Sequence, residues 1–186
     1  MVASGSADCT IKLWDAKTSL EVHTLEGHSN LVNSVAFLAD SLTVASGSAD
    51  CTIKLWDAKT GLEVRTLEGH SGSVQSVAFS ADSLTVASGS YDRMIKLWDA
   101  KTGLEVRTLQ CHRNWVRAVA FSADGTNFLI AVDKNWVFFA GERVLWLPSY
   151  HRHFTCSSTL NGTLALGYGD GRVSVIEFDP PFSTRH

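Results

Sequence analysis

The stretch GHSGSVQSVAFSADSLTVASGSYDRMIKLWD, residues 69–99, contains the pattern from which we predict the architecture. Apolar and polar residues alternate in Ser76–Phe79, Thr85–Gly89 and Ile95–Trp98, and again in Leu104–Leu109 just beyond. This period of two is typical of β-strands. Asp, Ser and Gly separate the runs and favour turns. The pattern therefore predicts four short strands that pair as one antiparallel sheet.

The same pattern recurs along the chain with a period of 42 residues. Trp14, Trp56 and Trp98 are spaced by that interval, and residues 2–42 match residues 44–84 at all but six positions. A third copy follows with a few more changes, and then a diverged copy and a remnant. One such sheet cannot bury both of its faces alone, but copies stacked side by side can. The sequence therefore predicts an all-β array of sheets.

Composition and charge exclude several classes of protein. The chain has 186 residues, of which 45% are hydrophobic and 19% charged, and its formal net charge is −3. This balance argues against a nucleic-acid partner, which needs clustered Lys and Arg. No run approaches the ~18 apolar residues of a membrane span, so we expect no membrane insertion, and no signal peptide is visible. Four Cys without CxxC spacing fit a reduced chain, and we expect a cytoplasmic location.

Two dipeptides give the repeat a family resemblance. Gly69-His70 precedes Leu97-Trp98-Asp99 by about 28 residues, which resembles the GH…WD signature of WD40 β-propellers. The resemblance is strong over residues 2–126 and weak over residues 127–178. It implies an all-β WD40 propeller arc of four-stranded antiparallel blades, each blade being one such sheet. With 186 residues and 42 per blade the chain holds about 4–5 blades, so we expect an incomplete ring.

We expect a single domain with a short tail. From the amino end its parts are a partial blade (1–28), two blades (29–70 and 71–112), a diverged blade (113–150), a partial C-terminal blade (151–180) and the tail (181–186). Further strands are expected in the weakly matching part at residues 127–132, 136–140, 143–147, 154–158, 163–166 and 172–178. Because the edges of an open arc are unpaired, we also expect self-association through them.

One His, one Ser and one Asp in each of two repeats have the residue types of a nucleophilic triad. In WD40 proteins the matching positions, with a Trp, form a structural network. Asp can orient the imidazole, the other ring nitrogen can meet Ser, and Ser can accept from the indole N–H. We therefore predict two structural tetrads, no catalytic residue and no enzyme activity. The tetrads are His28, Ser46, Asp50 and Trp56, and His70, Ser88, Asp92 and Trp98.

The tetrad is incomplete in the outer units. Ser4, Asp8 and Trp14 have no upstream His, and the fourth unit keeps His112 but has Lys134 at the Asp position. The last unit has Leu and Ile at the Ser and Trp positions. We therefore expect packing rather than a polar network to hold these units, and we expect them to open first.

Other candidate chemistry has a simpler interpretation. His151, His153 and Cys156 have ligand side chains for zinc but no clear fourth partner, so we expect a loop, no metal site and no cofactor. Cys9 and Cys51 follow the turn Asp in neighbouring units. They replace a turn Gly, and we expect no disulfide between them.

Positions that differ between otherwise copied units indicate a candidate partner surface, because they are free of the packing constraint. In a WD40 blade the matching positions line the top rim, the family's usual docking surface. Trp, Tyr and Arg are the residue types most often found as binding hot spots. Neutral drift on exposed loops is the alternative interpretation. We predict an unidentified protein partner at the rim residues Leu31, Asn33, Ser73, Gln75, Tyr91, Arg93, Trp115 and Arg117.

The last part of the chain has a narrower resemblance. Val144–Pro148 and Thr163–Gly167 are similar to the C-terminal end of fungal NACHT–WD40 proteins, which include heterokaryon (vegetative) incompatibility factors. This implies a non-catalytic protein-interaction scaffold, the sensing segment of a fungal receptor. The alternatives are an adaptor of another WD40 class, such as mitochondrial fission or ubiquitin-ligase and signalling scaffolds, and an inactive gene fragment.

Overall fold

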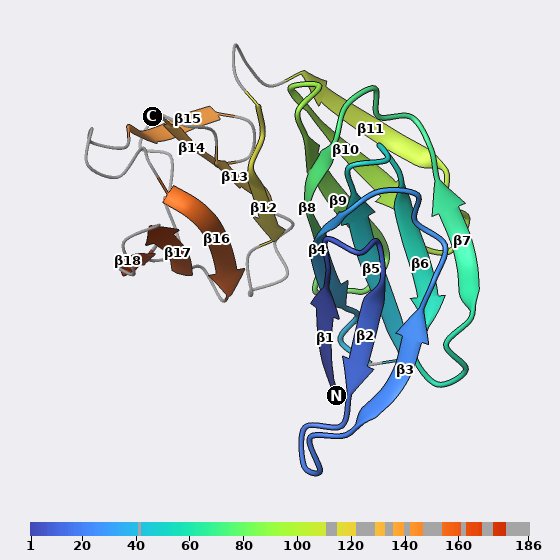
Figure 1. Ribbon diagram of the computed structural model, residues 1–186. Coiled ribbons are helices and arrows are strands. Elements are labelled where there is room, and N and C mark those ends of the chain that lie inside the picture. The colour runs from blue at the N-terminus through green and yellow to red at the C-terminus, as the bar shows by residue number, and fades with distance from the viewer. Residues whose placement is uncertain are drawn as a thin grey trace.

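The structure is a computed structural model that describes residues 1–40, 42–110 and 115–121 and the backbone of six strands between residues 129 and 177. All of the regular secondary structure in this described part is β-strand, and the strands form five antiparallel sheets (Figure 1). The described residues therefore include no candidate for a membrane-spanning helix.

The strands follow one another in each sheet in the order of the sequence. The first sheet contains β1 (Val2–Gly5), β2 (Ile11–Trp14) and β3 (Glu21–Leu25). The second contains β4 (Val32–Phe37), β5 (Thr43–Ser48), β6 (Ile53–Asp57) and β7 (Glu63–Leu67). The third contains β8 (Val74–Phe79), β9 (Thr85–Ser90), β10 (Met94–Asp99) and β11 (Glu105–Gln110).

The last two sheets are formed by the weakly matching part of the sequence. The fourth contains β12 (Ala118–Phe121), β13 (Leu129–Val132), β14 (Trp136–Phe139) and β15 (Glu142–Trp146). The fifth contains β16 (Phe154–Leu160), β17 (Thr163–Tyr168) and β18 (Val173–Glu177). The further strands expected in this part are thus confirmed as β13 to β18.

Two kinds of turn repeat from sheet to sheet. Between β6 and β7, Asp57 Oδ1 accepts the backbone N–H groups of Lys59 at 2.9 Å and Thr60 at 2.7 Å, and Gly61 has a φ of +74°. In the turns before β2 and β6, Cys9 and Cys51 have φ values of +73° and +72°. Only glycine adopts this left-handed region readily. Both cysteines thus have the backbone conformation of a turn Gly, which is what their interpretation as replacements of such a Gly requires.

The apolar cores lie between neighbouring sheets. Ile11, Leu13 and Leu25 of the first sheet pack with Val44 and Trp56 of the second, and all five side chains are buried. The second and third sheets pack together through the residues 42 positions further on in the same way. The third sheet also packs against Val116 and Val119, which lie just before and in the first strand of the fourth. The second and third sheets thus bury apolar residues on both faces, which removes them from water.

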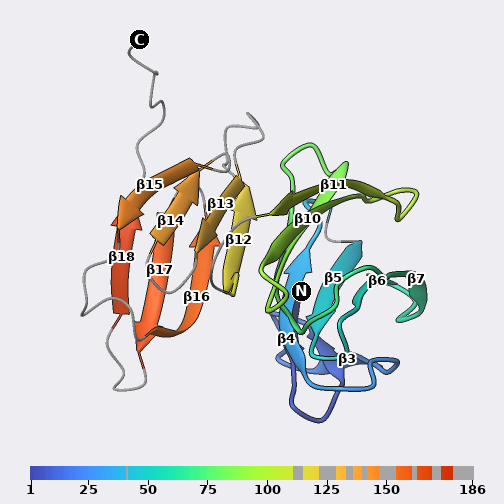
Figure 2. The ribbon, with the colours of Figure 1, turned by 90° about the horizontal axis from the view of Figure 1, so that it is seen from above.

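The first strands of successive sheets, β4, β8 and β12, lie beside one another (Figure 1). A side chain joins each pair: Ser34 Oγ accepts the backbone N–H of Val77, and Ser76 Oγ accepts that of Val119, both at 3.1 Å. We call Ser34 and Ser76 the seam serines. Figure 2 shows the sheets following one another around an open arc. The predicted all-β arc of antiparallel sheets is confirmed.

Candidate functional site

The second sheet brings His28, Ser46, Asp50 and Trp56 into one chain of hydrogen bonds. His28 Nδ1 lies 2.8 Å from Asp50 Oδ2, and His28 Nε2 lies 2.7 Å from Ser46 Oγ. Trp56 Nε1 donates to the same Ser46 Oγ at 2.8 Å. The loop before β4 carries the His, β5 carries the Ser, the turn after β5 carries the Asp, and β6 carries the Trp.

The third sheet repeats this arrangement 42 residues later. His70 Nδ1 lies 2.7 Å from Asp92 Oδ2, and His70 Nε2 lies 2.8 Å from Ser88 Oγ. Trp98 Nε1 donates to Ser88 Oγ at 2.8 Å. The structure thus brings together all four members of each set that the sequence analysis grouped.

Burial and hydrogen bonding shift the pKa values of the His and Asp members of the tetrads. Burial lowers the pKa of His28 and His70, although hydrogen bonds to the aspartates act in the opposite direction. A neutral imidazole donates from Nδ1 to the carboxylate and accepts at Nε2 from the Ser hydroxyl. Burial raises the pKa of Asp50, but hydrogen bonds from Thr52, His28 and the Ser29 backbone outweigh it and lower this pKa to about 2.

The tetrad serines are poor candidates for nucleophiles. Both Ser46 and Ser88 are 0% exposed, and each hydroxyl already contacts an imidazole and an indole N–H. A nucleophile must approach the carbonyl carbon of a substrate, so its oxygen has to be reachable. The arrangement has the residue types of a triad, but its geometry is that of a buried polar network.

The first sheet contains part of the same arrangement. Trp14 Nε1 donates to Ser4 Oγ at 3.0 Å, and Asp8 Oδ1 accepts from the backbone and hydroxyl of Thr10 at 3.0 and 2.7 Å. No described imidazole joins Ser4 to Asp8. In the fourth unit, His112 and Lys134 lie outside the described residues.

At the rim, the structure joins two of the predicted partner-binding residues directly. Tyr91 follows β9 and Trp115 precedes β12, and their rings stack with centroids 4.5 Å apart at an interplanar angle of 26°. Trp115 remains 45% exposed. The stack therefore bridges the third and fourth sheets and still presents aromatic surface to solvent.

Three other rim residues are bonded to one another. Asn33 Nδ2 donates to Ser73 Oγ at 3.0 Å and to the Val74 carbonyl at 2.8 Å, and Gln75 Nε2 donates to Ser73 Oγ at 2.7 Å. These bonds connect β4 with the entry to β8. The three side chains therefore link two sheets, and this structural role does not depend on a partner.

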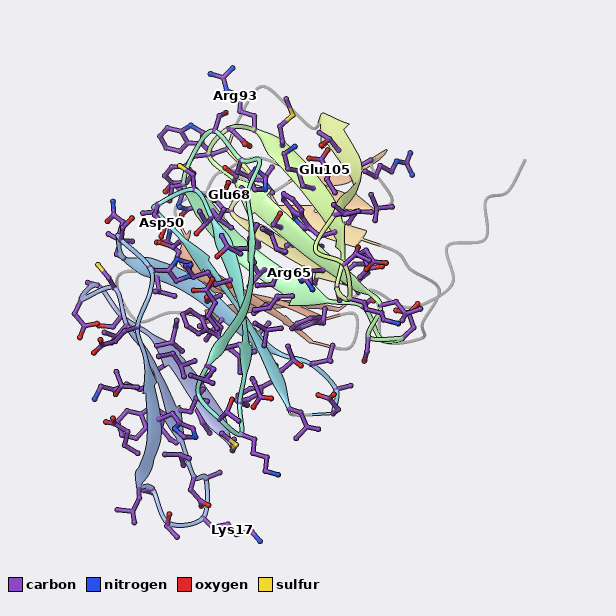
Figure 3. All side chains as sticks on the ribbon, turned by 90° about the vertical axis from the view of Figure 1, so that its right-hand side faces the viewer. Lys17, Asp50, Arg65, Glu68, Arg93 and Glu105 are labelled. Atoms are coloured by element: carbon purple, nitrogen blue, oxygen red, sulfur yellow. The ribbon has the colours of Figure 1, made fainter. Side chains whose placement is uncertain are left out.

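The remaining rim residues are spread over three sheets. Leu31 is exposed on the second, and Arg117, which is half-buried, lies beside the fourth. Arg93 is exposed in the turn of the third, with a φ of +72°. Figure 3 shows Arg93 at one end of the molecule and Lys17, from the β2–β3 hairpin, at the other.

The repeat pattern of the sequence does not indicate the role of the seam serines. Their partners Val77 and Val119 lie 43 residues away on another sheet, so no local pattern indicates the contact. The available signal is that Ser34 and Ser76 occupy equivalent positions, whereas Ala118 stands at that position in the fourth unit.

Candidate metal ligands lie elsewhere in the chain. His151 and His153 lie outside the described residues, and only the backbone of Cys156 is described. Among the described residues, no group of three His, Cys, Asp or Glu side chains could hold a metal ion. The thiols of Cys9 and Cys51 are both free.

The chain is similar over a short segment to two curated relatives. Both are called dynein assembly factor with WD repeat domains 1, one from Mus musculus and one from Danio rerio. Each is 53% identical over 34 residues, which is 18% of this chain and 8% of the relative. The matched segment is thus less than one repeat long.

A protein family matches most of the sequence. The family described as "WD domain, G-beta repeat" matches residues 1–15, 19–57, 61–99 and 103–139, more than half of the chain. These segments follow the repeat of 42 residues and include both tetrads. With the tetrad geometry and the stacked antiparallel sheets, this match shows that the chain belongs to the WD40 repeat family.

Proposed function

We propose that this chain is a non-catalytic scaffold that binds a protein partner through its rim. The rim patch consists of Tyr91, Arg93 and Trp115, on the third and fourth sheets. The observation that supports it best is the stack of Tyr91 on Trp115, which leaves a large aromatic side chain 45% exposed. Exposed aromatic and Arg side chains are enriched among hot spots.

The stack also makes the patch efficient for binding. Each ring limits the rotation of the other, so the side chains lose less conformational entropy when a partner covers them. Arg93 lies two residues after Tyr91 in a tight turn and offers a planar donor group. Aromatic faces with an Arg beside them suit a partner segment that has carboxylates and apolar side chains.

The burial of the tetrads supports a role without catalysis. Their polar groups are bonded to one another, and WD40 domains generally act as interaction scaffolds. The two serines that have triad-type partners are thus buried and offer no support for a catalytic role, so we propose binding as the function.

The more specific proposal is that the scaffold is the sensing segment of a fungal incompatibility-type receptor. The near-identical repeats and the similarity of residues 144–148 and 163–167 to fungal NACHT–WD40 proteins support it. We propose a cytoplasmic location on the ground that Cys9 and Cys51 are free thiols, as in a reducing compartment.

An adaptor of another WD40 class is the second proposal. The local identity of 53% to dynein assembly factors with WD repeats favours it. The two proposals differ in the partner, not in the surface. Identification of the partner would therefore distinguish the two proposals.

Affinity capture from a fungal lysate tests the rim patch. Tagged wild type is compared with Trp115→Ala and with Leu84→Ala by quantitative mass spectrometry. Leu84 is the matched control, because it is 64% exposed and lies in the β8–β9 turn, away from the β9–β10 turn that carries Tyr91. We expect proteins that wild type and Leu84→Ala retain and Trp115→Ala loses. Identical retention by all three proteins contradicts the proposal.

A further inference from the structure

Aliphatic side chains are exposed where the last strand begins in three successive sheets. These outer strands are β3, β7 and β11, and each follows a tight turn that contains an exposed Lys. One Leu and one Val in each sheet are between 44% and 68% exposed there. Apolar patches on a protein surface mark interaction sites. We call these nine residues the outer stripe: Lys17, Leu20 and Val22; Lys59, Leu62 and Val64; and Lys101, Leu104 and Val106.

The outer stripe is continuous from sheet to sheet. His23 Nε2 of β3 lies 3.0 Å from the carbonyl oxygen of Lys59, which belongs to the β6–β7 turn of the next sheet. A Cβ on Gly61 of the same turn would lie 3.1 Å from His23 Nδ1. A Cβ on Gly103 of the β10–β11 turn would likewise clash with Arg65 of β7. Each of these turns therefore packs on the outer strand of the preceding sheet, which brings the stripe residues of neighbouring sheets together.

The outer stripe presents positive charge. The carboxylates beside it already have partners, since Glu21, Glu63 and Glu105 form ion pairs with Lys12, Lys54 and Lys96 at 2.5, 2.8 and 2.6 Å. The turn carboxylates accept backbone N–H groups of their own turns; they are Asp15, Asp57 and Asp99. The three lysines of the stripe are exposed and form no ion pair within the described part of the chain. A partner with carboxylates therefore complements this surface.

The outer strands are poorly suited to pairing with an added strand. In each of them the register shifts, and the Val of the outer stripe has no partner on the neighbouring strand. Such β-bulges protect an exposed edge from pairing with another strand. A helix satisfies its own backbone hydrogen bonds, so it can cover the apolar side chains without using the strand edge.

We propose that the outer stripe binds an acidic amphipathic helix of a partner protein, which lies across the outer strands of neighbouring sheets. The apolar face of the helix covers the Leu and Val side chains, and carboxylates beside that face pair with the lysines. Packed sheets lie about 10 Å apart and a helix rises about 1.5 Å per residue, so successive sheets meet the helix at intervals of roughly seven residues or more.

Two other occupants fit the outer stripe less well. A second copy of this chain would bring a second row of lysines against the first if the two stripes met, and like charges repel. A lipid surface suits Trp and Tyr at the level of the headgroups, and the stripe contains neither. Charge and composition therefore favour the acidic helix.

A helical peptide of about 20 residues, built from Glu, Leu and Ala with Leu on one face and Glu beside it, tests the proposal. Fluorescence anisotropy of the labelled peptide measures its affinity for the 186-residue chain. We expect saturable binding that weakens as salt is added, and slower hydrogen exchange in residues 59–64 of the protein. A peptide of the same composition in scrambled order, and one with Lys in place of Glu, should not bind.

Two pairs of variants locate the contact. Leu62→Glu should weaken peptide binding about tenfold, because it replaces an apolar contact with a charge that repels the peptide. Leu31→Glu makes the same change at an exposed Leu before β4, on the opposite side of the same sheet, and should leave the affinity unchanged. Lys59→Gln should weaken binding about threefold, whereas Arg93→Gln removes the same charge at the rim and should not.

Several results overturn the proposal. They are absence of binding, equal binding of the scrambled peptide, and equal affinity of Leu62→Glu and Leu31→Glu. Adsorption to phosphatidylserine vesicles that Leu62→Glu abolishes, without peptide binding, assigns the outer stripe to a membrane surface instead. Self-association that the same variant abolishes in sedimentation, without peptide binding, assigns it to a second copy of the chain.

Discussion

The indole Nε1 of Trp98 donates to the hydroxyl of Ser88 at 2.8 Å, and the same Oγ lies 2.8 Å from His70 Nε2. One hydroxyl thus accepts from an indole on β10 and donates to an imidazole from the loop before β8. Ser88 is fully buried, so no water replaces a lost partner. The network therefore stabilises the sheet only while all of its members are present.

Removing a tetrad partner is expected to cost stability. Asp92→Asn and His70→Ala should each lower the free energy of unfolding by about 1–3 kcal/mol, because each leaves a buried group without its partner. Urea denaturation measures the change. Asp8→Asn is the control, since Asp8 holds Thr10 but no described imidazole, and it should stay within about 0.5 kcal/mol of wild type. A loss of equal size in Asp8→Asn contradicts the role of the imidazole.

Stability should fall on acidification in two steps. Burial lowers the pKa of His28 and His70 below the 6.5 of an unfolded chain, so the folded state binds fewer protons. The contribution of these neutral rings to the free energy of unfolding is complete above pH 6.5 and decreases as the pH falls below that value. Asp50, with a pKa of about 2 against 3.8 unfolded, adds a second loss below pH 3.8.

Melting temperatures between pH 8 and pH 3 test this dependence. His70→Gln removes one of the two described imidazoles whose pKa is lowered, so its melting temperature should change less between pH 7 and pH 5 than that of wild type. A melting temperature that rises on acidification from pH 7 to pH 5 contradicts the sign of the histidine shifts.

The buried hydroxyls should not react as nucleophiles. A fluorophosphonate reagent, which modifies activated serines, is expected to leave Ser46 and Ser88 unlabelled in the folded protein because both are 0% exposed. Peptide mapping by mass spectrometry locates any adduct. Stoichiometric labelling of Ser88 in protein that keeps its native melting temperature contradicts the structural role.

The seam serines are expected to hold neighbouring sheets together. Ser34→Ala removes the acceptor of the Val77 N–H and should lower the free energy of unfolding by about 1–3 kcal/mol, with faster hydrogen exchange at that amide. Ser71→Ala is the control, because its side chain is exposed and makes no hydrogen bond in the described structure. Unchanged exchange at Val77 in Ser34→Ala rules out this contact.

Substitution of the turn residue Cys51 by Gly is expected to raise stability. Cys51 has a φ of +72°, which costs an L-residue roughly 1–2 kcal/mol, while glycine adds about 0.5–1 kcal/mol of backbone entropy. Cys51→Gly should therefore raise stability by about 0.5–1 kcal/mol, whereas Cys51→Ala keeps the strain and should not. Thermal unfolding in reducing buffer compares the two. Equal melting temperatures argue against strain at this turn.

The sequence allows the strands and the members of each tetrad to be predicted because both depend on short-range periodicity and on the repeat. His70 and Ser88 could be paired since they recur together 42 residues earlier as His28 and Ser46. The polar contact of Asn33 with Ser73 could not, because it joins different sheets over 40 residues. A position that varies between the repeats can contact the neighbouring sheet. This contact depends on how the sheets stack and not on the local sequence pattern.

The seam between sheets has a consequence for how the array changes length. Ser34 bonds to the residue 43 positions on, so one 42-residue unit carries the acceptor for the next sheet and the donor for the previous one. A duplicated unit therefore brings the hydrogen-bond donor and acceptor that both of its interfaces need. Deletion of a unit leaves a donor and an acceptor that can pair with each other. Gene copying can lengthen or shorten such an array by whole units without any new contact having to evolve.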